Sequence, residues 1–205
     1  MTILKLIISF SNLRLVFNRN DENIKNLYIS FYENARTTQY YSRNVFFWIQ
    51  YALAVMDIND YDAAEIYLDN ASAFSKEHFN EESYQIELLR ARLLLEKTMY
   101  KNDYENAFKN FESAHFLICS NRTPERHYPY RQVSNYIKYY NKFFKQFTYD
   151  EKVYFMQICV EIRNKMNEYL SSKNAYERSN RKANKDIEQI VRKIGIIIDE
   201  MAKDS

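Results

Sequence analysis

The stretch Trp48–Ala71, WIQYALAVMDINDYDAAEIYLDNA, decides the fold because the chain carries a second copy of its pattern. The second copy is Ala91–Ala114, ARLLLEKTMYKNDYENAFKNFESA, at an offset of 43 residues. Each copy predicts two short helices joined by an Asn-Asp-Tyr-acid turn. Because one such pair cannot bury its apolar face alone, repeated pairs must stack on one another. The repeat therefore predicts an all-α protein, an array of helical hairpins.

The matched positions hold large apolar residues, small residues and turn residues. In the first copy they are Trp48, Ala52, Asp60, Tyr61, Asp62, Ala64, Leu68 and Ala71. In the second copy they are Ala91, Leu95, Asp103, Tyr104, Glu105, Ala107, Phe111 and Ala114. The small residues allow two helix backbones to approach closely. Asp60 and Asp103 suit the N-cap position, because a carboxylate accepts hydrogen bonds from free N–H groups there.

Glycine is nearly absent, and this excludes several classes of enzyme. Gly195 is the single glycine of the 205 residues. Walker loops, dinucleotide-binding GxGxxG turns and GxSxG nucleophile elbows all need more than one glycine, so this sequence contains none of these motifs. Tight two-residue hairpin turns also favour glycine. The composition therefore agrees with an all-α chain.

Hydrophobic spacing predicts further helices, separated by polar turns. The predicted helices cover 2–17, 24–35, 45–58, 61–76, 83–100, 103–120, 130–147 and 150–170, and residues 36–44 are predicted as a loop. Thr148 and Glu151 form a T-x-x-E capping box before the last of these helices. We expect one domain over 1–205, with an N-terminal helix pair (1–44), two hairpins (45–120) and C-terminal helices (121–205).

The N-terminus and the cysteines indicate a cytoplasmic chain. Polar residues interrupt the apolar stretch 2–17, which is also shorter than the roughly 20 apolar residues that span a bilayer. Its charge does not precede the apolar part as in a signal peptide. Cys119 and Cys159 form no CxxC motif and are predicted to be buried, reduced thiols. We therefore expect no membrane association.

The hairpin positions resemble the tetratricopeptide (TPR) pattern of Trp, small residue, Ala, aromatic or Leu, and Ala. The residues at these places are Trp48, Ala52, Ala64, Leu68 and Ala71. The period of 43 residues is longer than the TPR period of about 34 residues. The resemblance is therefore to divergent, TPR-like repeats, and it implies a short α-solenoid that binds protein.

Longer stretches of the chain resemble the C-terminal helical region of large prokaryotic anti-phage proteins. They include SFSNLRLVF, YQIELLRARLLLE, AFKNFESAH and RHYPYR. Those proteins carry a STAND-type P-loop NTPase or a sirtuin-type NADase toward the N-terminus. This sequence contains neither, so the resemblance implies only a sensor or scaffold role. The implied partner is an NTPase or NADase effector on a separate polypeptide, or a phage protein. A fragment or a shortened reading frame is the other explanation.

The predicted partner-binding residues lie at a hairpin junction and are Arg126, His127, Tyr130 and Arg131. Arginine forms bidentate bonds with carboxylates, so this junction suits an acidic peptide or a neighbouring domain. The alternative is nucleic acid, because segment 122–145 interleaves basic and aromatic residues. Helical spacing, however, predicts that Tyr136, Tyr140, Phe143 and Phe147 lie opposite Lys138, Lys142 and Lys145, which disfavours one joint platform.

The last segment of the chain, residues 174–203, has a polar first half, and its second half carries an apolar stripe that includes Ile187, Ile190, Ile194 and Ile198. We expect this stripe to close the end of the solenoid. The alternative is a homo-oligomer that pairs the stripe with a second chain. The stripe is short for a coiled coil, which usually needs three or four heptads.

The sequence suggests neither catalysis nor a metal site. His115 and Cys119 have the i, i+4 spacing of two metal ligands, but a structural zinc site needs four. The carboxylate pairs Asp60/Asp62 and Glu81/Glu82 lie at helix starts, where the helix dipole favours negative charge. We therefore expect a non-enzymatic protein without catalytic residues, cofactor or metal.

Overall fold

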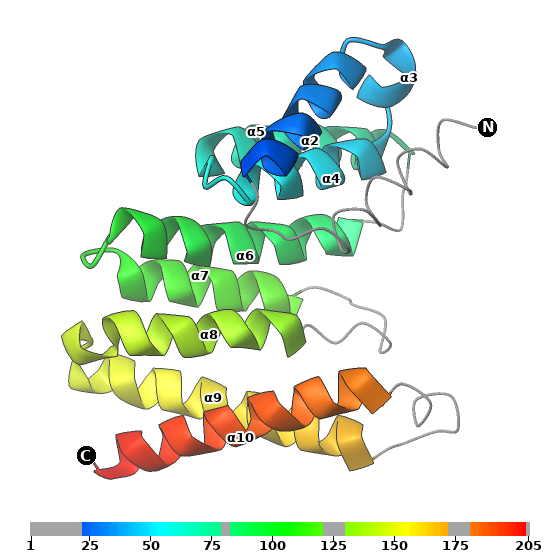
Figure 1. Cartoon of the computed structure of the whole chain (residues 1–205). Coiled ribbons are helices and arrows are strands. Elements are labelled where there is room, and N and C mark those ends of the chain that lie inside the picture. The colour runs from blue at the N-terminus through cyan, green and yellow to red at the C-terminus, as the bar shows by residue number, and fades with distance from the viewer. Residues whose placement is uncertain (1–21, 79–82, 121–129, 172–180, 204–205) are drawn as a thin grey trace. The chain divides into compact units, whose positions relative to one another are not determined.

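The computed structural model describes residues 22–78, 83–120, 130–171 and 181–203 (Figure 1). Over these ranges it contains nine α-helices and one 3-10 turn, and no strand. The all-α prediction is thus confirmed for the described residues. The predicted helix over 2–17 and the pair Glu81/Glu82 lie outside them. The chain forms two compact units, residues 1–100 with 114–122 and residues 101–113 with 123–205.

The first unit contains the helices of the first predicted hairpin. Its helices are α2 (Glu22–Ala35), α3 (Gln39–Ser42), α4 (Val45–Met56), α5 (Tyr61–His78), α6 (Ser83–Lys101) up to Tyr100, and the end of α7 (Ala107–Ser120) from Ala114. Predicting 36–44 as a loop throughout was wrong, because α3 forms one helical turn there. The Thr38 carbonyl accepts from the N–H groups of Tyr41 and Ser42, and the Tyr41 side chain is buried.

The core of the first unit is built around α4, which packs closely against α5. Ala52 on α4 and Ala64 and Ala71 on α5 are fully buried. Aromatic side chains fill the space beside them, and the Tyr51 and Tyr67 rings stack with centroids 3.9 Å apart. Burial and the Tyr67 hydroxyl raise the pKa of Tyr51 above its usual range. The small residues therefore lie where α4 and α5 approach, and the large ones fill the space beside them, as their spacing predicted.

Both copies of the Asn-Asp-Tyr-acid turn have the same backbone feature. Asn59 has φ 63° and Asn102 has φ 52°, and they are the described non-glycine residues in the left-handed region. Asparagine tolerates this region better than most residues, so it stops one helix and reverses the chain. The two asparagines lie 43 residues apart, the offset of the sequence repeat.

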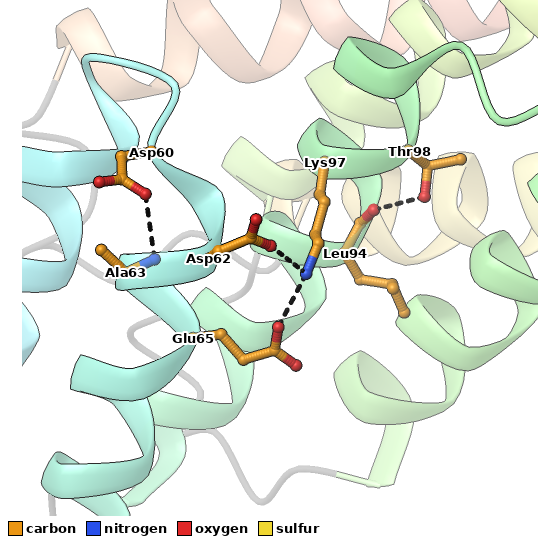
Figure 2. Close-up of polar contacts among 7 residues, drawn as sticks. All are labelled: Asp60, Asp62, Ala63, Glu65, Leu94, Lys97 and Thr98. Carbon is orange, nitrogen blue, oxygen red and sulfur yellow. Dashed lines mark hydrogen bonds and ion pairs between the residues drawn. The ribbon is translucent and has the colours of Figure 1, made fainter.

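The aspartates after these asparagines accept the same backbone hydrogen bond. Asp60 Oδ1 accepts from the N–H of Ala63 at 3.1 Å (Figure 2), and Asp103 Oδ1 accepts from the N–H of Asn106 at 3.2 Å. Asp60 thus caps α5 as predicted. Asp103 was predicted to begin a helix, but α7 (Ala107–Ser120) begins four residues later. Residues 103–106 form a non-helical turn, in which the Ala107 N–H bonds to the Tyr104 carbonyl.

The second unit contains the start of α7, up to Ser113, and three further helices. They are α8 (Tyr130–Phe143) with the 3-10 turn η2 (Phe144–Gln146), α9 (Tyr149–Ser171) and α10 (Arg181–Lys203). Phe111 of α7 lies in the core, with its ring centroid 4.5 Å from Phe155 and 5.0 Å from Tyr136. The Tyr139 hydroxyl donates a 2.7 Å hydrogen bond to the Ala107 carbonyl, which fixes α8 to α7.

The predicted capping box at the start of α9 is confirmed. The Thr148 N–H donates to Glu151 Oε2 at 2.7 Å, and the Glu151 N–H donates to Thr148 Oγ1 at 3.4 Å. Both arms of the box are therefore formed. The helix before it ends earlier than predicted, because the chain tightens into η2 and then extends at Phe147.

The buried positions reveal a third occurrence of the hairpin pattern, which the residue types of the internal sequence repeat did not show. Ala91 and Leu95 of α6 are buried, and so are Tyr139 and Phe143 of α8, 48 residues later. The same offset relates the buried Ala107, Phe111 and Ala114 to the buried Phe155, Cys159 and Ile162 of α9. The spacing of buried positions recurs although the residue types differ.

Candidate protein-interaction surface

The four residues of the predicted junction are only partly within the described chain. Arg126 and His127 lie outside the described residues. Tyr130 and Arg131 form the first turn of α8, where the structure describes the backbone but not these side chains. The junction hypothesis thus stays a prediction.

The aromatic and basic residues of α8 lie on different faces. Tyr136, Tyr139 and Phe143 are at most 2% exposed, and their rings pack in the core of the second unit. Phe144 and Phe147 are also buried. Lys138 and Lys145, in contrast, are exposed to solvent. Tyr140 is only partly buried, and the side chain of Tyr130 is not described. The buried rings are thus occupied by the core, as the helical spacing predicted for Tyr136, Phe143 and Phe147.

The lysines of α8 and η2 form a basic stripe, defined here as Lys138, Lys142 and Lys145. Its ends are seven positions apart in the sequence: Lys138 and Lys142 lie on α8, and Lys145 lies on the 3-10 turn η2 that follows it. The Lys142 Nζ lies 5.7 Å from the centroid of the Phe143 ring. Among the described residues, Lys138 and Lys145 form no ion pair.

In the first unit, basic residues of α6 instead pair with acids of α5. Lys97 Nζ lies 2.9 Å from Asp62 Oδ1 and 2.8 Å from Glu65 Oε2 (Figure 2). Arg90 Nη2 lies 2.7 Å from Asp69 Oδ1. Hydrogen bonds to Glu65 and then Asp62 raise the pKa of Lys97. We call these contacts the α5–α6 ion ladder. They give Asp62 a structural role.

The apolar stripe of α10 packs within the chain. Ile194, Ile197 and Met201 are at most 5% exposed, and α10 contacts both α8 and α9. Ile190 and Ile198 are partly buried, and the side chain of Ile187 is not described. This packing favours the expected closing role of α10. A homo-oligomer through the same face would require α10 to leave α8 and α9, and it remains an untested alternative.

The predicted His–Cys spacing brings two side chains together on α7. Cys119 Sγ lies 3.4 Å from His115 Nε2, and Cys119 is exposed, not buried as predicted. Over the described part of the chain, no third His, Cys, Asp or Glu joins them. Cys159 is buried as predicted, and burial raises the pKa of its thiol to about 12. His127 lies outside the described residues, as does the side chain of His78.

The comparisons leave the chain's family open. Among the described helices, none combines the length and apolar character needed to cross a bilayer. Comparison with protein-family models, with curated proteins and with solved structures found no match. Function must therefore be inferred from the residues and contacts described above.

Proposed function

We propose that this chain is a TPR-like helical-hairpin repeat domain, a short α-solenoid, and that it acts as a cytoplasmic, non-enzymatic protein-interaction module. The observation that carries the proposal is the recurrence of one hairpin design. Asn59 and Asn102 share a left-handed backbone, and Asp60 and Asp103 each accept the N–H three residues later. Helical repeats of this kind present extended surfaces that bind other proteins.

The more concrete part of the proposal rests on the sequence resemblance alone. We place the chain as a sensor or scaffold of a bacterial anti-phage defence system. Its partner is then an NTPase or NADase effector on a separate polypeptide, or a phage protein. The junction around Arg126–Arg131 contacts that partner through arginine–carboxylate bonds.

A nucleic-acid-binding adaptor is the alternative from another class. Its support is the exposure of Lys138 and Lys145 on a segment without acids between Arg126 and Tyr149. The burial of Tyr136, Tyr139 and Phe143 weighs against it, because sequence-tolerant binding of single strands relies on rings that stack on bases. Protein binding is therefore the better-supported proposal.

The first test is an affinity pull-down of the tagged full chain from the cell that encodes it. We expect a stoichiometric protein partner and an absorbance ratio at 260 and 280 nm that nuclease treatment does not change. Arg131→Glu should release the partner, whereas Lys165→Glu, the same charge change at an exposed position of α9, should not. A nuclease-sensitive absorbance without any protein partner would overturn the proposal in favour of nucleic acid.

A further inference from the structure

The α5–α6 ion ladder shows how this chain joins one helix to another through charges. Two basic residues of α6, Arg90 and Lys97, lie two turns apart on the same face. Arg90 contacts Asp69, and Lys97 contacts Asp62 and Glu65. On α5 the acids Asp62, Glu65 and Asp69 are spaced i, i+3 and i+7. The ladder thus matches a basic i, i+7 stripe with an acidic helical stripe.

The basic stripe of α8 repeats the position and spacing of the two basic residues of α6. Arg90 precedes the buried Ala91 by one residue, and Lys138 precedes the buried Tyr139 by one residue. Lys97 follows the buried Leu95 by two residues, and Lys145 follows the buried Phe143 by two. The same two repeat positions therefore carry the positive charges in α6 and in α8 with the following turn η2.

The acidic half of the ladder is incomplete in the second unit. The repeat offset of 43 residues places Glu105, Phe108 and Glu112 where α5 has Asp62, Glu65 and Asp69. Phe108 cannot bind a lysine as Glu65 does, and its ring packs against Phe147 and Tyr154. Glu105 and Glu112 are exposed, and within the described residues neither pairs with the lysines of the stripe.

Two features favour carboxylates over phosphates as the ligands of this stripe. The chain itself supplies carboxylates to the equivalent positions in α6, at 2.7–2.9 Å. A single nucleic-acid strand would need aromatic platforms beside the lysines, and Tyr136, Tyr139 and Phe143 of α8 are buried. A helix with acids at i, i+3 and i+7 offers the charges at the spacing that α5 uses.

We propose that Lys138 and Lys145 dock an acidic helix of a partner protein, with carboxylates arranged as on α5. Lys142 lies between them on the same stripe. This inference rests on the proposed protein-binding function and specifies the chemistry of the partner. Such a contact is electrostatic and solvent-exposed, so it steers and orients the partner and weakens as salt rises.

The test uses the full chain and a defined probe. The probe is a fluorescent, alanine-based helical peptide of about 17 residues with Glu at i, i+3 and i+7, and its control carries Gln at those places. Binding is followed by anisotropy and by amide chemical shifts at about 50 mM salt, where screening is weak. The double variant Lys138→Glu/Lys145→Glu is compared with Lys165→Glu/Lys193→Glu, which makes the same charge change at exposed positions of α9 and α10.

We expect the Glu peptide to bind more tightly than the Gln peptide, with shifts centred on α8 and η2. The stripe variant should weaken binding about tenfold and the control variant less than twofold, since two exposed ion pairs are reversed. Equal loss in both variants, or equal binding of the Gln peptide, would overturn the inference. So would tighter binding of an oligothymidine with the same dependence on Lys138 and Lys145. A cellular partner retained by the stripe variant would overturn this inference while leaving the proposed function intact.

Discussion

Two phenylalanines on α7 should lose very different amounts of stability when each is truncated to Ala. Phe111 is fully buried, with its ring centroid 4.5 Å from that of Phe155, whereas Phe116 is 68% exposed. A buried Phe removes about 150–250 Å² from water, which at roughly 25 cal/mol per Å² corresponds to about 4–6 kcal/mol. Phe111→Ala should therefore lower the free energy of unfolding by about 3–5 kcal/mol, the range that core Phe truncations show. Phe116→Ala should change it by less than about 0.5 kcal/mol.

The measurement is urea unfolding of both variants, followed by circular dichroism at 222 nm. If Phe111→Ala does not fold, Phe111→Leu keeps most of the volume and should lose about 1.5 kcal/mol. The slope of free energy against urea should stay constant, since the surface exposed on unfolding hardly changes. Equal losses at Phe111 and Phe116, or less than about 1 kcal/mol at Phe111→Ala, would show that the described packing of α7 is incorrect.

Three further expectations concern turns, caps and thiols. Thr148→Ala breaks one arm of the capping box at the start of α9 and should lower the free energy of unfolding by about 1 kcal/mol in a urea titration. An unchanged free energy of unfolding would argue against the box. Glycine suits both left-handed positions, Asn59 and Asn102, but Asn59 also accepts a 3.0 Å hydrogen bond from the Tyr61 hydroxyl. In thermal unfolding, Asn59→Gly should therefore be about 1 kcal/mol less stable than Asn102→Gly. An aromatic disulfide reagent at pH 7 should modify Cys119 rapidly and Cys159 only after unfolding, since burial raises the pKa of the Cys159 thiol to about 12, and two fast thiols would contradict that burial.

The features that could be predicted from sequence are local. Asp60 was recognised as a cap from its place before a helix, and the pair Thr148/Glu151 from its spacing, because both depend on residues within one turn. The separation of Lys138 from the rings of α8 likewise follows from 3.6 residues per turn. The left-handed Asn59 could have been expected from its residue type, although no glycine marked the turn.

The features that were missed depend on contacts between distant segments. The α5–α6 ion ladder joins Lys97 to Asp62, 35 residues earlier, and no spacing within one helix reveals it. The helices over 130–147 and 150–170 were predicted, but their match to the repeat pattern was missed. Tyr139, Phe155 and Cys159 replace the residue types of the earlier copies, and only the burial of these positions recurs. The helical turn α3 depends on the burial of Tyr41, and the polar sequence around Tyr41 does not predict that burial.

Repetition also explains why the surface of this chain is more informative about function than its core. The buried positions must satisfy packing in every hairpin, so they carry the same constraint in each copy. The charged positions beside them carry no such constraint and can diverge. Where the first unit has the carboxylate of Glu65, the second unit has the half-buried ring of Phe108, which packs against Phe147 and Tyr154. A packed Phe stabilises the second unit more than one exposed ion pair would, because such pairs contribute at most about 1 kcal/mol. By the repeat correspondence, Lys145 has a ring where Lys97 has the carboxylate of Glu65.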